Sequence, residues 1–204
     1  YLELDRIGAP RHLVQALPNP VNKDLSMEML KQVDLVVVTG SQNNVRAAYT
    51  CGTPAFGVGA GNVTSLIDET ADLASAAAKI KASKTFDNAT SCSSENSLIM
   101  VKAIYNDMLK ALESVNGCLL TPKETAKLEA VLWHKGHLNA AMLAKPVSVM
   151  CELAGITRTS ACDADFLMVE ETGAGADFPF SGEKMALVLT LYRAQDFDDA
   201  KKVA

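Results

Sequence analysis

The 204-residue sequence lacks the features that assign a protein to a membrane, a secretory route or a nucleic acid. No apolar run reaches the roughly 18 residues of a membrane-spanning helix, and the run at residues 34–39 has only the length of a strand. Residues 1–6 have neither the basic start nor the apolar stretch of a secretory signal. Lys and Arg number 19 against 24 Asp and Glu, which gives a net charge of −5 and no basic stripe to neutralise phosphates. We therefore expect no membrane segment and no nucleic-acid partner.

The cysteine pattern excludes the common cysteine-based frameworks. No pair has the C-x-x-C spacing of a zinc or redox motif, and five cysteines make an odd number. No His, Asp or Glu cluster indicates a metal site either. The sequence therefore predicts a reduced, cytoplasmic chain without a metal. The cysteines are Cys51, Cys92, Cys118, Cys151 and Cys162.

The sequence does contain the apolar material of a substantial core. Hydrophobic residues make up 49% and charged residues 21% of the chain. This composition fits one large domain or two small ones and excludes a disordered chain. There is no initiator Met, and residues 196–204 have the pattern of a helix that has only begun. We therefore expect a fragment truncated at both ends.

The first third of the chain alternates strands and helices in the manner of a doubly wound α/β layer. The β-branched run 33–39 predicts a strand buried on both faces. Gly40 and Ser41 then open a helix that ends at Gly52, and residues 55–59 form the next buried strand.

From Asn62 onward the pattern changes, which indicates a second region of mixed helices and strands. An Ala-rich helix is expected over 68–81, because its apolar residues fall on one face. A polar loop at 83–96 follows, and Thr121 and Pro122 predict the cap and first turn of a later helix. The other expected elements are strands at 11–17, 98–101, 166–169 and 185–192, helices at 26–32 (capped by Ser26) and 147–153, and a Gly-rich loop at 172–182.

Two stretches in these elements could carry chemistry. Cys92 lies among small polar residues between two elements, where a thiol is accessible, although ordinary loop cysteines occupy the same setting. Gly40 and Ser41 stand at a strand-to-helix corner, where backbone N–H groups can hold a phosphate. A plain helix cap at Ser41 explains the same residues.

A third stretch has Gly57, Gly59 and Gly61 at the end of a strand, which allows a ligand or a neighbouring element to approach closely. In their order along the chain, these stretches resemble the aldehyde dehydrogenase superfamily and, within it, the branch that acylates coenzyme A. The resemblance is carried by Thr39-Gly40-Ser41, Gly52-x-Pro54-Ala55-x-Gly57-Val58-Gly59-Ala60-Gly61-Asn62, Phe86-Asp87-Asn88-x-x-x-Cys92-x-Ser94-Glu95 and Pro179-Phe180-Ser181-x-Glu183-Lys184-Met185.

The resemblance implies a three-layer α/β/α fold with two domains. Residues 1–62 would be the C-terminal part of a Rossmann-like NAD-binding domain. Residues 63–204 would be the catalytic domain, incomplete at its C-terminal end. In this family a cysteine thiolate, here Cys92, adds to an aldehyde and keeps the acyl group as a thioester after hydride transfer.

The implied cofactor is NAD or NADP. By resemblance, Gly40 and Ser41 would lie beside its pyrophosphate and Gly59 would line the nicotinamide. Glu183 matches the acidic residue that holds the ribose hydroxyls on the nicotinamide side.

The residue at position 58 distinguishes hydrolysis of the thioester from acyl transfer to coenzyme A within the superfamily. Hydrolytic relatives carry a Glu at the matching position, where it activates water, and Val cannot accept a proton. Coenzyme A is therefore the implied acyl acceptor and an acyl-CoA the product. The hydroxyl-rich loop 88–96 either satisfies its own backbone or favours an anionic aldehyde. The candidate substrates are sulfoacetaldehyde, succinate semialdehyde and acetaldehyde, with a lean towards sulfoacetaldehyde.

Two other functions remain open from the sequence. The chain could be an inactive structural fragment of such an enzyme, or a cofactor-free hydrolase that uses Cys92 and His137. The family also implies a homo-oligomer, dimeric or larger, and a location in the cytoplasm or inside a bacterial microcompartment.

Overall fold

A computed structural model describes residues 2–59 and 61–204, so Tyr1 and Ala60 lie outside the described residues. The chain divides into two compact units, residues 1–60 and 61–204. The division falls two residues before the domain boundary expected from the sequence, and the assignment of the two domains stays a prediction.

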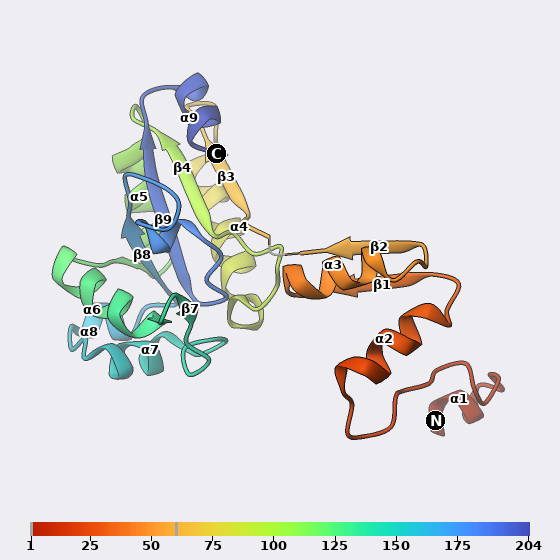
Figure 1. Ribbon diagram of the computed structural model, residues 1–204. Helices are drawn as coiled ribbons and strands as arrows, with labels where there is room; N and C mark the ends of the chain where they lie inside the picture. The colour runs from red at the N-terminus through yellow and green to blue at the C-terminus, as the bar shows by residue number, and fades with distance from the viewer. Residues whose placement is uncertain (1, 60) are drawn as a thin grey trace. The chain divides into compact units, whose positions relative to one another are not determined.

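The first unit contains a strand, a helix and a second strand in succession along the chain (Figure 1). Strand β1 (Val36–Thr39) pairs in parallel with β2 (Ala55–Val58), and α3 (Gln42–Thr50) connects them. The side chain of Ser41 caps α3 by accepting a hydrogen bond from the Asn44 N–H. The preceding helices are α1 (Leu2–Arg6) and α2 (Lys23–Lys31).

Four expectations for this unit are wrong. The strand expected to be buried at 55–59 spans Ala55–Val58 and is exposed at Phe56 (67%) and Val58 (58%). Residues 11–17 form turns and irregular backbone instead of a strand. The cap of α2 is Asn22, whose side chain accepts from the Leu25 N–H, so Ser26 lies inside the helix. The strand expected at 33–39 is shorter and has one exposed face, on which Val37 is 74% exposed, because no described element covers that face.

In the second unit, all the strands of one five-stranded sheet run parallel, in the order β3-β4-β9-β8-β5. The strands of this sheet are β3 (Thr64–Ile67), β4 (Ser97–Val101), β5 (Gly117–Leu119), β8 (Phe166–Glu170) and β9 (Val188–Ala194). The last strand of the chain therefore lies in the middle of the sheet. Buried strands of this kind read as continuous apolar runs, as Leu98 to Val101 does.

Helices cover both faces of this sheet and complete the three layers (Figure 1). On one face α4 (Leu73–Thr85) packs against α5 (Tyr105–Ser114). On the other face α9 (Phe197–Val203) buries Ala200 against Ile99 and Tyr192. The fold is therefore the expected three-layer α/β/α arrangement. The other elements are α6 (Pro122–Leu132), α7 (Val147–Ala154), α8 (Thr159–Cys162), the antiparallel pair β6 (Trp133–His134) and β7 (His137–Leu138), and the 3-10 turns η1 (Phe86–Ala89) and η2 (Pro179–Ser181).

Two element boundaries in this unit differ from expectation. The Ala-rich helix starts at Leu73 with Asp72 as its cap, because the Asp68 carboxylate accepts two hydrogen bonds from Thr70 and holds that segment in a turn. It then continues to Thr85, into the expected polar loop. The strand expected at 185–192 is displaced to Val188–Ala194.

Candidate functional site

The cysteine loop, residues 86–96, joins α4 to β4 through a left-handed turn. Asp87, Asn88 and Ala89 have φ angles of 49°, 50° and 62°, which non-glycine residues adopt rarely. The Thr90 hydroxyl locks the turn, with Oγ1 lying 2.8 Å from the Asp87 carbonyl and 2.7 Å from its carboxylate. The Asn88 side chain donates to the Ala144 carbonyl at 3.2 Å. Such a strained turn persists only where several contacts hold it.

Cys92 lies at the surface of this loop. All five cysteines belong to the described part of the chain, and Cys92 alone among them is exposed. Within residues 2–59 and 61–204, the Cys92 backbone N–H donates to no acceptor, so it can serve an incoming oxygen. A Cβ built on Gly61 would lie 3.6 Å from the Cys92 carbonyl oxygen, which puts the end of the glycine stretch beside this loop.

Two other cysteines are unsuited to attack a substrate. Cys118 and Cys151 are both buried. Burial, together with the neighbouring Cys162 thiol, raises the pKa of Cys151 to about 12. A thiol that stays protonated is a poor nucleophile.

Glu183 follows directly on the turn Phe180–Gly182 and is half-buried. Two side chains fix the first carbonyl of this turn, that of Phe180. The buried Lys184 ammonium donates to it at 2.7 Å and to the Gly182 carbonyl at 3.2 Å. The Thr190 hydroxyl of β9 also donates to the Phe180 carbonyl, at 2.6 Å.

A second buried lysine, Lys84, contacts the C-terminal end of the cysteine loop. The Lys84 ammonium donates to the Glu95 carbonyl at 2.9 Å. Burial lowers the pKa of Lys84 to about 8, against the opposing charge of Glu95. Burial, together with the charge of Lys84, also holds the pKa of Lys184 well below its usual range. Sequence reasoning missed Lys84, although its spacing of four residues from Ile80 puts it on the buried face of α4.

In the first unit, the structure brings Gly40, Ser41 and Gly59 together at the carboxyl ends of β1 and β2. The Gly40 N–H donates to the Val58 carbonyl at 3.2 Å. A Cβ on Gly59 would come within 2.5 Å of the Gln42 side chain at the start of α3, so a larger residue would displace that side chain. Ligands bind at this edge in open parallel sheets, and helix N-termini there attract anions.

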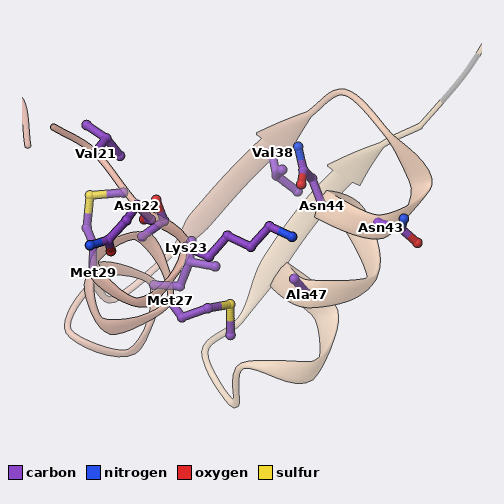
Figure 2. A pocket seen from close by; sticks show the side chains of 11 residues that line it. Val21, Asn22, Lys23, Met27, Met29, Val38, Asn43, Asn44 and Ala47 are labelled. Atoms are coloured by element: carbon purple, nitrogen blue, oxygen red, sulfur yellow. Dashed lines mark hydrogen bonds between the residues drawn. The ribbon is translucent and has the colours of Figure 1, made fainter.

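A cavity of about 600 Å³ adjoins α3 in the same unit, and sequence reasoning missed it (Figure 2). It opens between α2 and the β1–α3 segment, and the Lys23 side chain points across it towards α3 (Figure 2). Its lining mixes apolar and amide side chains: Val21, Asn22, Lys23, Ser26, Met27, Met29, Leu30, Val38, Asn43, Asn44 and Ala47. Residues of α2 and its cap, from Asn22 to Leu30, form one wall of the cavity.

The predicted residues thus fall into two groups, with Gly40, Ser41 and Gly59 in the first unit and Cys92 and Glu183 in the second. Among residues 2–59 and 61–204, no three His, Cys, Asp or Glu side chains are arranged to hold a metal ion. None of the helices described in those ranges is both long and apolar enough to cross a membrane.

Curated sequences match almost the entire chain. The acylating sulfoacetaldehyde dehydrogenase of Cupriavidus necator is 57% identical over 197 residues, covering 97% of this chain and 40% of the relative. The acylating sulfoacetaldehyde dehydrogenase of Bilophila wadsworthia is 42% identical and covers 98% of this chain and 44% of the relative. The chain therefore spans less than half the length of these relatives. No protein-family model matches it.

Solved structures also match the fold over almost the entire chain. An acetylating aldehyde dehydrogenase from Geobacillus thermoglucosidasius superposes with a TM-score of 0.91 at 35% identity, over 98% of this chain and 44% of that structure. A propionaldehyde dehydrogenase of Rhodopseudomonas palustris with bound propionyl-CoA has a TM-score of 0.85 at 28% identity, over 99% and 44%. An engineered glycolyl-CoA reductase with bound NADP+ has a TM-score of 0.86 at 28% identity, over 98% and 45%.

Proposed function

By sequence and fold this chain belongs to the CoA-acylating branch of the aldehyde dehydrogenase superfamily, and on that premise we propose that it supports NAD(P)-dependent oxidation of a small aldehyde to an acyl-CoA. The observation that carries the proposal is the exposed Cys92 on a loop held in a left-handed turn, with a free backbone N–H at the same residue. A thiol in that setting can reach a carbonyl and can stabilise the oxyanion that forms.

Cys92 is the proposed catalytic residue. Its thiolate adds to the aldehyde carbon, and the carbonyl oxygen becomes an oxyanion within reach of the Cys92 N–H. When bound, NAD(P)+ accepts the hydride that leaves this carbon. The acyl group then remains on Cys92 as a thioester, which stays activated towards a second nucleophile.

The described residues fit a nicotinamide dinucleotide. The N-terminus of α3 at Gly40 and Ser41 suits the pyrophosphate, and Gly59, which packs without a side chain against Gln42, lies at the same edge of the sheet. The adjoining cavity, with apolar and amide walls, suits the adenosine part. Glu183, held by the fixed turn before it, would accept hydrogen bonds from ribose hydroxyls.

Coenzyme A is the proposed acyl acceptor. Val58, at the end of β2, has no group that can take a proton from water. Loss of a positioned base slows a reaction by on the order of 10²–10⁴-fold, so hydrolysis of the thioester should be slow. The CoA thiol is a better nucleophile and completes the turnover.

Sulfoacetaldehyde is the proposed substrate, with succinate semialdehyde and acetaldehyde as the alternatives to test. Both curated relatives described above are named acylating sulfoacetaldehyde dehydrogenases. The loop hydroxyls argue less strongly, because Ser91 and Ser93 bond to each other at 2.8 Å and Thr90 bonds to Asp87. A homo-oligomer in the cytoplasm, or inside a microcompartment, completes the proposal.

The test uses the natural full-length protein with an aldehyde panel, NAD+ or NADP+, and CoA present or absent. Reduced nicotinamide is followed by absorbance and acyl-CoA by mass spectrometry. We expect CoA-dependent formation of both products, lost in Cys92→Ala and retained in Cys162→Ala, a matched change at a half-buried cysteine. Absence of any product would indicate an inactive protein. Ester cleavage without cofactor would indicate a hydrolase that uses Cys92 and the exposed His137.

A further inference from the structure

Two asparagines from distant parts of the chain donate hydrogen bonds to the Ser181 and Gly182 carbonyls of the turn before Glu183. The Asn62 side chain donates to the Ser181 carbonyl at 2.9 Å. The Asn96 side chain donates to the Gly182 carbonyl at 2.7 Å and to the Asn62 Oδ1 at 2.6 Å. The backbone immediately before Glu183 is therefore held from outside its own loop.

Asn96 is also fixed at its backbone. Its N–H donates to the Val63 carbonyl at 2.9 Å, and its carbonyl accepts from the Thr190 N–H at 3.0 Å. The residue is only 4% exposed, so its carboxamide depends on these partners for hydrogen bonding. Each bond joins the end of the cysteine loop to another element of the second unit.

The position of Asn96 in the chain shows which two segments its hydrogen bonds connect. Asn96 follows Cys92 by four residues and ends the cysteine loop at β4, while Gly182 is joined to Glu183 by one peptide bond. The Asn96–Gly182 hydrogen bond is thus a short bridge between the nucleophile's loop and the residue expected to hold the cofactor ribose.

We propose that Asn96 is a positioning residue, whose carboxamide keeps the Cys92 loop and the Glu183 turn in one fixed relation. The inference rests on the proposed function, because it assigns Cys92 to the aldehyde and Glu183 to the cofactor. Hydride transfer requires both groups to be aligned. Transfer of the acyl group from Cys92 to CoA requires only the cysteine loop.

The two half-reactions can be measured separately in the natural full-length protein. A single burst of NAD(P)H, with aldehyde and NAD(P)+ but no CoA, reports hydride transfer. Exchange of the acyl group between acyl-CoA and isotopically labelled CoA reports acyl transfer without a hydride step. The variants are Asn96→Ala, Asn96→Gln, which keeps an amide donor, and the neighbouring Ser97→Ala as control. Ser97 is equally buried, and its hydroxyl has no partner among the described residues.

We expect Asn96→Ala to slow the NAD(P)H burst by on the order of 10²-fold, the cost of a small misalignment of reacting groups. Acyl exchange should stay close to the wild-type rate, Asn96→Gln should recover part of the burst, and Ser97→Ala should change neither. If Asn96→Ala fails to fold, Asn62→Asp at an exposed residue keeps an oxygen acceptor for the Asn96 amide and should largely retain the burst. Asn62→Ala removes that acceptor as well as the donor to the Ser181 carbonyl and should lower the burst alone.

An equal slowing of both half-reactions, or an unchanged burst, would overturn the role of Asn96 while leaving the proposed function standing. A wild-type protein without CoA-dependent NAD(P)H formation would instead refute the proposed function and the inference with it.

Discussion

The Lys84 ammonium donates a hydrogen bond to the Glu95 backbone carbonyl at 2.9 Å, three residues beyond Cys92. Only 2% of Lys84 is exposed, so a formal charge supports the cysteine loop from inside the protein. A buried ammonium loses hydration, which makes the stability of this unit depend on pH.

Lys84 should destabilise the folded state most below pH 8. Burial lowers its pKa from 10.5 to about 8, so between these values the unfolded chain binds more protons than the folded one, and stability rises with pH. Lys84→Met has no ammonium at this position and therefore lacks this rise of stability with pH. Its free energy of unfolding relative to wild type should therefore fall by on the order of 1–3 kcal/mol across that window. Urea denaturation measures the difference, with the exposed Lys79→Met as control on the same helix. Parallel pH curves for Lys84→Met and wild type would contradict the prediction.

Glu124 and Arg158 form a pair that should stabilise the second unit above mildly acidic pH. The guanidinium donates to both carboxylate oxygens, with Nε at 2.9 Å from Oε1 and Nη2 at 2.8 Å from Oε2. The hydrogen bonds from Arg158, together with those from the Thr121 N–H and hydroxyl, lower the pKa of Glu124 from 4.5 to about 2. The stabilisation is present above pH 4.5 and is lost as the pH falls towards 2.

Glu124→Gln should therefore cost about 1–3 kcal/mol at neutral pH, as expected for hydrogen bonds to a charged group. The gap to wild type should shrink on acidification, as measured by chemical denaturation. Glu129→Gln, at an exposed residue of the same helix, should have little effect. A gap that is constant with pH would argue against the ion pair.

Alkylation should discriminate among the five cysteines by exposure. At mildly alkaline pH, iodoacetamide should modify Cys92 first, while Cys118 and Cys151 stay unmodified in the folded protein. Burial raises the pKa of Cys151 to about 12, which leaves little thiolate there. Mass spectrometry of proteolytic peptides gives the order of labelling. Modification of Cys151 as fast as Cys92 would show that the described packing is wrong.

Glu183→Gln should weaken cofactor binding if Glu183 holds the ribose hydroxyls. Replacing a charged acceptor by a neutral one loses about 1.5–3 kcal/mol per hydrogen bond, so KM for NAD(P)+ should rise about 10- to 100-fold. Steady-state kinetics measures the change. Asp177→Asn, at an exposed residue of the same loop, serves as the matched control, and an equal rise in both variants would remove Glu183 from this role.

Val58→Glu should make turnover less dependent on CoA. Under the proposed function, this Glu would match the base of the hydrolytic relatives that the sequence resembles, and hydrolysis of the thioester should accelerate by on the order of 10²-fold. Continuous NAD(P)H formation without CoA measures it, with Val58→Gln as the variant of equal size that cannot act as a base. Similar rates from the Glu and Gln variants would rule out base catalysis at this position.

Local chemistry explains which elements could be predicted from the sequence. The start of α6 was predictable because Thr121, Pro122 and Glu124 form a complete capping box within four residues. The start of α2 was not, because Asn22 and Ser26 are both good caps and only the chain's path decides between them. The exposure of Cys92 followed from its small polar neighbours, which cannot form a core.

Long-range pairing explains what could not be predicted. Strand β5 has only three residues, which is too short for a hydrophobic pattern to indicate a strand or its place at the sheet edge beside β8. The burial of Asn96 depends on its hydrogen bond to the Gly182 carbonyl, far along the chain, and no local pattern shows that partner. Helical spacing from Ile80 indicates the buried face for Lys84, but not the Glu95 carbonyl that satisfies its ammonium. The cavity beside α3 likewise depends on where α2 lies, which no local signal specifies.

The central place of β9 has a consequence for how the polypeptide matures on the ribosome. Until residues 188–194 emerge, β4 and β8 each expose an unpaired edge, and the sheet consists of two separate pairs, β3–β4 and β8–β5. Such edges invite mispairing with other nascent chains. Translation arrest before residue 188 should therefore leave a protease-sensitive, aggregation-prone intermediate. Once residues 188–194 emerge, β9 can pair with β4 and β8 and cover both edges together.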